Sequence, residues 1–308
     1  IEAKMNREDI YWGAQLAAVE MIKSGTTCFA DMYAPYMEEV AKSTIESGLR
    51  GVLCRVLFGF SDQDGHLLNE GVSLFKNFHG AGEGRVKVMF GPHAPYTCHP
   101  EYLSMLGEEA KKLGAEIHIH MAETVNELET IQKQYGMRPF AYVESTGLFE
   151  NGTLAAHCVH LNDEDFEIIK KHNIRVAHNP VSNMKLASGS CQVSRLLKEG
   201  VTVGLGTDGA SSNNNLDMID EMKFAAVFEK GATFNPLAVS ALDALNMATK
   251  YGAKVVGIDD IGQIAPGFKA DLVLHDLNSA EWCPRHNLVS LLVYSASKET
   301  VDTVICDG

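Results

Sequence analysis

Residues 117–123 read Ile-His-Ile-His-Met-Ala-Glu, a short β-branched run that ends in chemically active side chains. Such a run predicts a buried strand with His120 at its C-terminal end and Glu123 on the loop that follows. His118 shares the strand parity of His120, so both side chains point to one face, and either could be a metal ligand. This unit, an apolar strand ending in a polar residue, recurs along the chain and decides the fold.

Seven such runs are present, and their starts lie roughly 29 residues apart, which suits repeated strand-plus-helix units. Helical patterns lie between them, with Gly after the helix and Asp or Pro before it as the stop and start signals. The predicted strands are 26–31, 51–57, 86–93, 117–120, 153–157, 175–178 and 202–208, and the clearest helical patterns are 9–24, 100–113, 163–171 and 235–252.

Strands that are apolar almost throughout are buried on both faces, which indicates a parallel sheet covered by helices. A doubly wound open sheet and a closed (β/α)8 barrel both satisfy this pattern. The barrel is favoured because polar residues end at least five strands, and only a barrel brings that many strand ends to one site. These residues are Asp31, His93, His120, His157 and Asp208.

The expected fold class is therefore α/β, a TIM-type (β/α)8 barrel. Seven strand–helix units precede residue 210, so we expect the first strand to be missing and to lie upstream of Ile1. We predict a barrel over residues 1–258. Residues 259–308 are predicted to be part of a small accessory β-sandwich, with a turn-rich β segment at 261–276 and a strand at 301–305.

Composition excludes several classes of function. The formal net charge of −14 disfavours nucleic acid and other polyanions as partners. No apolar run approaches the roughly 18 residues of a membrane span, so no membrane partner is expected. Seven cysteines without a Cys-x-x-Cys pair indicate reduced thiols and a cytoplasmic protein. A nucleophile elbow, a Walker loop and a dinucleotide fingerprint are all absent from the sequence.

The strand-end residues each have a plain structural interpretation. His120 and His157 could be hydrogen-bonded histidines, His93 could belong to a rigid turn between two prolines, and Asp208 could cap the next helix. Together they favour catalysis, because nitrogen ligands and a carboxylate around an open position hold catalytic zinc, which lowers the pKa of bound water to near 7. His160 follows His157 at His-x-x-His spacing, which would suit a second metal ligand. We expect it on the loop beyond the strand, where a structural role is favoured.

A further segment, 178–189, begins at His178 and continues through Asn-Pro to Ser182, Asn183 and Lys185. Its polar residues predict an ordered loop over a site, since long ordered loops at this face of a barrel usually carry function. A turn with capping side chains is the alternative.

Five motifs in their order and spacing resemble the amidohydrolase superfamily. Within it they resemble the branch of 5′-methylthioadenosine/S-adenosylhomocysteine deaminases and their chlorohydrolase-like relatives. The resemblance covers essentially the whole chain, including the tail at 262–276. The motifs are GPHAPYTC (91–98), HIHMAET (118–124), AAHCVHL (155–161), HNPVSNMKLASG (178–189) and GLGTDGASSNN (204–214).

This resemblance implies the roles of the catalytic residues. His120 and Asp208 would be metal ligands, and Asp208 would also take the proton of the attacking water. Glu123 would protonate the purine ring nitrogen. His157, close to the metal, would polarise the hydroxyl and the tetrahedral intermediate.

The resemblance also implies substrate contacts. His93 would lie near the ribose or the tail of a nucleoside. Glu2 matches the place where the family holds ribose hydroxyls with a Glu, and a carboxylate can accept from two hydroxyls. Arg55, at a strand terminus, would meet a substrate carboxylate.

One departure from the family concerns the metal. The family has a His-x-His pair on the first barrel strand, and no such pair occurs before Thr26. We therefore expect an N-terminally truncated chain that lacks two of four metal ligands, binds metal poorly and is nearly inactive alone. The chain also stops at Gly308, where relatives continue with more β structure.

The leading functional expectation is hydrolytic deamination of S-adenosylhomocysteine, 5′-methylthioadenosine or adenosine by an enzyme with one divalent metal, zinc first, with iron and manganese left open. Glu2 favours a substrate that carries ribose. The alternatives are a related deaminase or chlorohydrolase acting on guanine, cytosine or a triazine, and an inactive metal-free barrel. The expected partner is the small-molecule nucleoside, and assembly into a homo-oligomer is left open.

Overall fold

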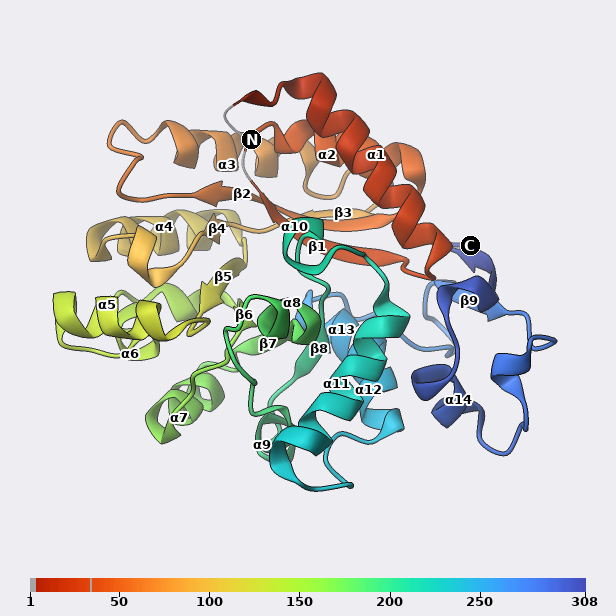
Figure 1. Cartoon of the computed structure of the whole chain (residues 1–308). Helices are drawn as coiled ribbons and strands as arrows, with labels where there is room; N and C mark the ends of the chain where they lie inside the picture. Colours follow the sequence, from red (N-terminus) through yellow and green to blue (C-terminus); the bar gives the residue numbers. More distant parts are fainter. Residues whose placement is uncertain (1–3, 34) are drawn as a thin grey trace. The chain divides into compact units, whose positions relative to one another are not determined.

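The computed structural model describes residues 4–33 and 35–308 (Figure 1). By its internal contacts the chain divides into two compact units. Each unit is described by itself. Helix α1 (Arg7–Lys23) begins in unit 1 and ends in unit 2. The domain boundary expected at residue 258 stays a prediction. Unit 1 is formed by Ile1–Ala18 and Cys28–Ile174, and unit 2 by Val19–Thr27 and Arg175–Gly308.

Unit 1 contains parallel strands. β2 pairs with β1 on one side and with β3 and β4 on the other, and β5 pairs with β6. Every residue of β2 is buried, as expected for a strand covered on both faces. The strands are β1 (Cys28–Tyr33), β2 (Arg50–Leu57), β3 (Val86–Val88), β4 (Gly91–Pro92), β5 (Ile117–Met121) and β6 (Thr153–His157).

The predicted third strand forms two short strands, β3 and β4, and both pair with β2. Between them Phe90 bonds toward β5 on the opposite edge, since its amide donates to the carbonyl of Glu116 and its carbonyl accepts from the amide of His118. At the resumption of the strand, a Cβ on Gly91 would lie 2.8 Å from the Cβ of Cys54, so only glycine fits without a shift. Directly after β4 the carbonyl of His93 accepts from the amide of His120, which joins this end of the strand to β5.

The helices of unit 1 begin and end at recognisable signals. α4 has Pro100 at its first position and Gly114 in the left-handed conformation at its end. For α7 the cap differs from the predicted one, because Asn162 and not Asp163 caps the helix, in a capping box with Asp165. These elements are α2 (Met37–Ser47), α3 (His66–Phe78), α4 (Pro100–Leu113), α5 (Val125–Tyr135), α6 (Pro139–Glu144) and α7 (Asp163–Lys171), with short 3-10 helices η2 (Pro95–Thr97) and η3 (Leu148–Asn151).

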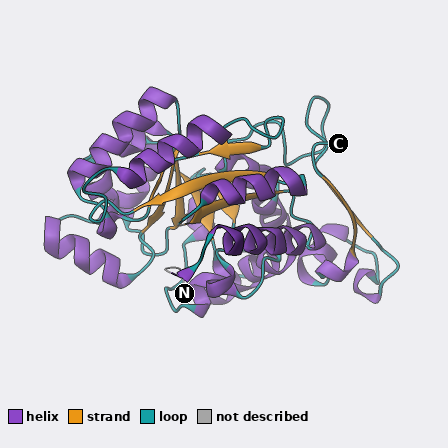
Figure 2. Ribbon diagram, turned by 90° about the horizontal axis from the view of Figure 1, so that it is seen from above, coloured by secondary structure: helices purple, strands orange, loops and turns teal. Residues whose placement is uncertain are grey.

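In unit 2, β7 and β8 pair in parallel, and β9 and β10 pair antiparallel. Strand structure lies near the C-terminus (Figure 2). The antiparallel pair confirms β structure in 261–276 and 301–305, although a helix, α14, lies between the strands. The elements are β7 (Arg175–His178), α8 (Pro180–Lys185), α9 (Val193–Lys198), β8 (Val203–Leu205), α10 (Ala210–Asn213), α11 (Met218–Thr233), α12 (Ala241–Ala248), α13 (Lys250–Val255), β9 (Leu272–His275), η4 (Ala280–Trp282), α14 (Leu288–Tyr294), η5 (Lys298–Thr300) and β10 (Val301–Ile305).

Every predicted apolar run thus contains a strand, and the α/β class with parallel strands is confirmed. Four local expectations were wrong. β8 ends at Leu205, so Asp208 lies beyond the strand and not at its end, and the helical pattern 235–252 forms two helices, α12 and α13, of which the first begins at Ala241. Asp31 does not end its strand, because β1 continues to Tyr33. Residues Pro180–Lys185 form a helix and not a loop, because proline is well accommodated at the first position of a helix, where no amide partner is needed.

The seven cysteines, all in the described part of the chain, form no disulfide bond. In the described ranges, none of the helices has the length and apolarity that crossing a membrane requires.

Candidate active site

The register of β5 and β6 brings two of the predicted histidines together. Met121 lies opposite His157 and His120 opposite Ala156, so the histidines are one step apart on neighbouring strands. Their rings stack with centroids 5.5 Å apart. His157 has φ of 72°, a left-handed conformation that is uncommon for a residue with a Cβ. Backbone strain of this kind collects at functional sites.

His93 joins this pair from the end of β4. Its ring centroid lies 5.0 Å from that of His120, and its carbonyl oxygen lies 2.6 Å from Nδ1 of His120. A carbonyl only accepts, so Nδ1 of His120 carries the proton and Nε2 carries the lone pair. Metal-binding histidines are commonly oriented in this way by a carbonyl on the second ring nitrogen.

The environment of His93 keeps its ring neutral. Burial, and secondarily the neighbouring His120, lower the pKa of His93 to about 4. Nδ1 of His93 lies 3.1 Å from the hydroxyl of Thr97, and that hydroxyl itself donates to the carbonyl of Ala94. His93 therefore donates from Nδ1 to Thr97, which leaves Nε2 as an acceptor suited to a hydroxyl group.

Glu123 lies on the loop after β5, next to His157. The distance from Oε2 of Glu123 to Nε2 of His157 is 3.8 Å. The side chain of His157 is 3% exposed and that of Glu123 is 20% exposed, so the pair is sheltered but the carboxylate reaches solvent. Unit 1 thus assembles an acid–base pair beside two further imidazoles.

One residue of this region carried only a weak sequence signal. Glu127 follows Thr124 by three residues, the spacing of a helix capping box. In the structure its buried carboxylate accepts from the amides of Ala122 and Glu123, at 2.8 and 2.9 Å. Burial, opposed by these amide hydrogen bonds, raises the pKa of Glu127 to about 7.

Asp208 belongs to unit 2, where it follows β8. Its Oδ2 accepts from the hydroxyls of Ser182 and Ser212, at 2.6 and 3.1 Å, and its Oδ1 accepts from the amide of Gly209 at 2.7 Å. The backbone of Asp208 is left-handed, with φ of 59°. Three donors and a strained backbone hold this carboxylate in one orientation, which the cap interpretation does not require.

The polar residues after β7 support Asp208 from α8. Ser182 donates to its carboxylate, and Lys185 donates to the carbonyl of Ser211 and to the side chain of Asn214 at the end of α10. His178 ends β7 and is buried, and its carbonyl accepts from the amide of Gly206. Helix α8 therefore braces the segment that carries Asp208.

Beneath this segment lies a fully buried carboxylate. Oε1 of Glu221, on α11, accepts from the amide group of Asn213 at 2.5 Å, and the same amide group donates to the carbonyl of Thr207 at 2.8 Å. Burial is the main cause that raises the pKa of Glu221 to about 8. The folded protein therefore holds Glu221 largely protonated at neutral pH.

Glu221→Gln is expected to make stability less dependent on pH. The folded pKa lies above the ordinary value of 4.5, so the wild type loses stability as pH rises from about 4.5 through about 8. The loss by pH 7 is roughly 3 kcal/mol, at 1.36 kcal/mol per pH unit. Denaturant unfolding measures the free energy of unfolding at pH 5 and pH 8. The value for the variant, relative to that for the wild type, should be larger at pH 8 than at pH 5. Glu164→Gln, at an exposed position, serves as the control. The expectation would be contradicted if Glu221→Gln and the wild type differed in free energy of unfolding by the same amount at both pH values.

The other predicted residues do not take part in the contacts described above. Nδ1 of His118 lies 3.6 Å from Sγ of Cys54, deeper along β5 than His120. His160 lies on the loop beyond β6, as expected. Arg55 is buried, and its guanidinium donates to Glu70 at 2.6 Å and to the carbonyl of Val56, so its contact with a substrate stays a prediction. Glu2 lies outside the described residues.

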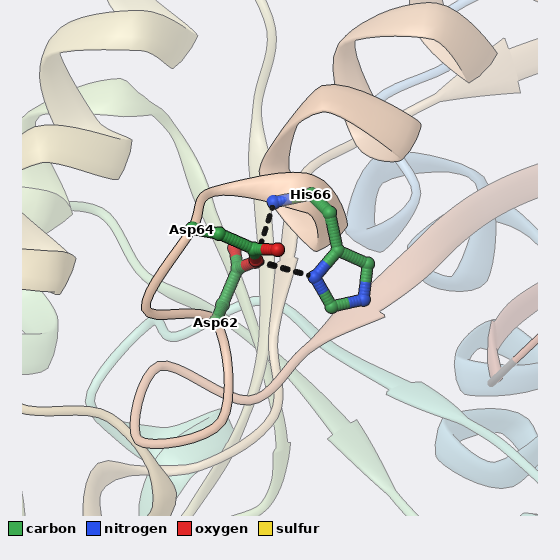
Figure 3. Close-up of side chains that lie close together, drawn as sticks. All are labelled: Asp62, Asp64 and His66. Carbon is green, nitrogen blue, oxygen red and sulfur yellow. Dashed lines mark hydrogen bonds and ion pairs between the residues drawn. The ribbon is translucent and has the colours of Figure 1, made fainter.

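A second group of potential ligands lies at the start of α3. Asp64 and His66 point toward one another beside Asp62 (Figure 3), and all three lie close enough to share a cation. The carboxylate of Asp62, however, already accepts from the amides of Leu67 and Leu68 and from the hydroxyl of Tyr102. This group is accounted for as the N-terminal support of α3.

Known proteins resemble the chain along its whole length. The model of the amidohydrolase family matches residues 2–308. The 5-methylthioadenosine/S-adenosylhomocysteine deaminase of Dictyoglomus thermophilum is 49% identical over 307 residues, which cover 100% of this chain and 72% of the relative. The protein of the same name from Desulfitobacterium hafniense is 51% identical over 310 residues, with 100% and 71% covered.

A solved structure gives the same result for the fold. The zinc-bound adenosine deaminase of Xanthomonas campestris is 32% identical, with a TM-score of 0.94 over 99% of this chain and 70% of the other. The predicted amidohydrolase barrel fold is thereby confirmed, and so is the resemblance inferred from the five motifs. The chain belongs to the amidohydrolase family.

Proposed function

We propose that the protein hydrolytically deaminates an adenine nucleoside, with S-adenosylhomocysteine, 5′-methylthioadenosine and adenosine as the candidate substrates. The observation that carries the proposal is the group of His93, His120 and His157 with Glu123, gathered at the ends of β4, β5 and β6. The names of the relatives that are about half identical to the chain support the same chemistry.

The donor set fits a divalent metal, for which we propose zinc. Nε2 of His120 carries the lone pair that a metal ligand needs, and Asp208 offers a carboxylate of fixed orientation. The Xanthomonas deaminase with bound zinc supports this choice of metal. When bound, the metal supplies Lewis acidity that brings the pKa of a water molecule to near 7.

The residues of the chain divide the proton transfers of the reaction. In this proposal Asp208 takes a proton from the attacking water, and Glu123 delivers a proton to the ring nitrogen beside the reacting carbon. His157 donates a hydrogen bond to the oxygen that adds to that carbon. A C–O bond forms, and the proton held by Asp208 passes to the amino group as the C–N bond breaks and ammonia leaves. The proton of the added hydroxyl returns to Glu123, which leaves the inosine analogue as the second product.

The substrate contacts are likewise proposals. His93, whose Nε2 is an acceptor, would bind a hydroxyl of the ribose or its tail. Glu2 would accept from the ribose hydroxyls, and Arg55 would meet a substrate carboxylate such as that of S-adenosylhomocysteine. We propose the cytoplasm as the compartment, because cysteines without disulfide bonds are typical of a compartment where glutathione keeps thiols reduced.

The test is turnover by the purified, zinc-loaded protein expressed from its complete gene. The ultraviolet shift from adenine to hypoxanthine would be followed with the three nucleosides, and ammonia release with adenine, guanine, cytosine and a chlorotriazine. The proposal expects deamination of at least one nucleoside, its loss on chelation and its return with zinc. Turnover of only a free base or a triazine would replace this function by another within the family.

A further inference from the structure

Glu127 binds the backbone of the loop that carries Glu123. It stands in the first turn of α5 and is 1% exposed. Its Oε1 accepts from the amide of Ala122 at 2.8 Å, and its Oε2 accepts from the amide of Glu123 at 2.9 Å. Both oxygens of one carboxylate therefore hold two successive amides.

The same loop is held from its other side. The carbonyl of Ala122 accepts from the amides of Val159 and His160, at 3.1 and 2.9 Å. Ala122 has φ of 49°, in the left-handed region that alanine rarely adopts. Such a conformation persists only where the surroundings impose it, and here hydrogen bonds on both faces of the loop do so.

Helix capping alone does not account for this arrangement. The hydroxyl of Thr124 accepts from the amide of Glu127 at 3.2 Å, which is the ordinary first half of a capping box. In the second half, the glutamate would reach back to the amide of the capping residue, Thr124. The carboxylate of Glu127 reaches further back, to the two residues before the cap.

We propose that Glu127 is a positioning residue for the proton transfer, which fixes the loop so that Glu123 faces His157. The inference rests on the proposed function and deepens it, since Glu123 is the proposed proton donor. A buried carboxylate is costly unless donors compensate it, and the two amides supply that compensation only while the loop keeps its catalytic shape. We call these two hydrogen bonds to the carboxylate of Glu127 the clamp. Without the clamp, the carboxyl group of Glu123 is still present, but the loop no longer fixes its position.

Glu127→Gln tests the clamp with little change in volume. Glutamine keeps one acceptor oxygen and turns an N–H donor toward the other amide, so one of the two hydrogen bonds is lost. We expect kcat for the deamination to fall about 30-fold to 100-fold with KM changed less than about 3-fold, because misplacement near 1 Å can cost about 100-fold. An unchanged kcat would overturn the inference.

A double-mutant cycle separates positioning from general destabilisation. If Glu127 acts through Glu123, then Glu123→Gln with Glu127→Gln should be no more than about 3-fold slower than Glu123→Gln alone. Losses that multiply in the double variant would show an independent, structural role. Glu229→Gln is the matched control, because Glu229 is also buried and accepts a backbone amide, that of Ser194 at 3.0 Å, and its loss should leave kcat unchanged.

Hydrogen exchange provides a measurement that does not depend on enzymatic activity. The amides of Ala122 and Glu123 should be strongly protected in the wild type, and in folded Glu127→Gln they should exchange at least about 10-fold faster than in Glu229→Gln. Fast exchange of both amides in the wild type would overturn the clamp. Absence of nucleoside turnover by the wild type, with these amides protected, would instead refute the proposed function while leaving the clamp intact.

Discussion

Glu123→Gln should lower kcat for nucleoside deamination about 1,000-fold in the zinc-loaded protein. Glutamine has nearly the same shape but cannot carry a proton to the ring nitrogen, and positioned acid–base groups contribute about 10² to 10⁴ in rate. KM should change little, because the lost interaction acts in the transition state and not in ground-state binding. The measurement is steady-state kinetics on the best nucleoside of the panel.

The control for this variant lies on the next helix. Glu129→Gln makes the same chemical change at an exposed position of α5 and should leave kcat within about 2-fold of the wild type. Zinc content and thermal unfolding should match for both variants. If Glu123→Gln kept a tenth or more of the wild-type kcat, Glu123 would not be the proton donor, and another acidic group would have to protonate the ring nitrogen.

Asp208→Asn should have the larger effect, a fall of roughly 10⁴-fold in kcat/KM together with loss of bound metal. The carboxylate is proposed both as a metal ligand and as the group that takes the water proton, so one change removes two contributions. Asparagine is chosen because it tolerates the left-handed φ of 59° at this position, which alanine would strain. Metal per chain would be measured by elemental analysis beside the kinetics.

Asp217→Asn is the matched variant in the same unit. Asp217 caps α11 by accepting from the amides of Ile219 and Asp220, and asparagine is an equally good N-cap. Both stability and turnover should therefore be preserved. If Asp208→Asn kept full metal content and lost activity only, the carboxylate would act as a base without binding metal, and a different ligand would have to be found.

The strand ends show how far the sequence alone leads. Buried parallel strands need continuous apolar runs, and a polar residue that closes such a run stands out, so His93, His120 and His157 were found from the pattern. Asp31 was misplaced because the apolar pattern cannot fix the last residue of a strand to better than a few positions. Residues 180–185 were misread because an Asn-Pro step both interrupts one helix and starts another.

Glu127 and Glu221 illustrate what the pattern cannot reveal. Both are charged residues in helices, where sequence periodicity assigns them to solvent, and both are almost fully buried in the structure. Their burial depends on amides and side chains that come from other segments of the chain. A capping box was visible at Thr124 and Glu127, but which amides the carboxylate reaches depends on the three-dimensional path of the loop.

The sequence by itself determined the α/β class, the family resemblance and the identity of most candidate catalytic residues. These depend on local periodicity and on the kinds of side chain that end each strand. Only the tertiary structure decided which nitrogen of His120 is protonated and that Nε2 of His157 lies 3.8 Å from Oε2 of Glu123. It also decided that the carboxylate of Glu127 binds the loop that carries Glu123. The physical reason is that hydrogen bonds and desolvation act between neighbours in space, and the register of the strands, not the order of residues, makes those neighbours.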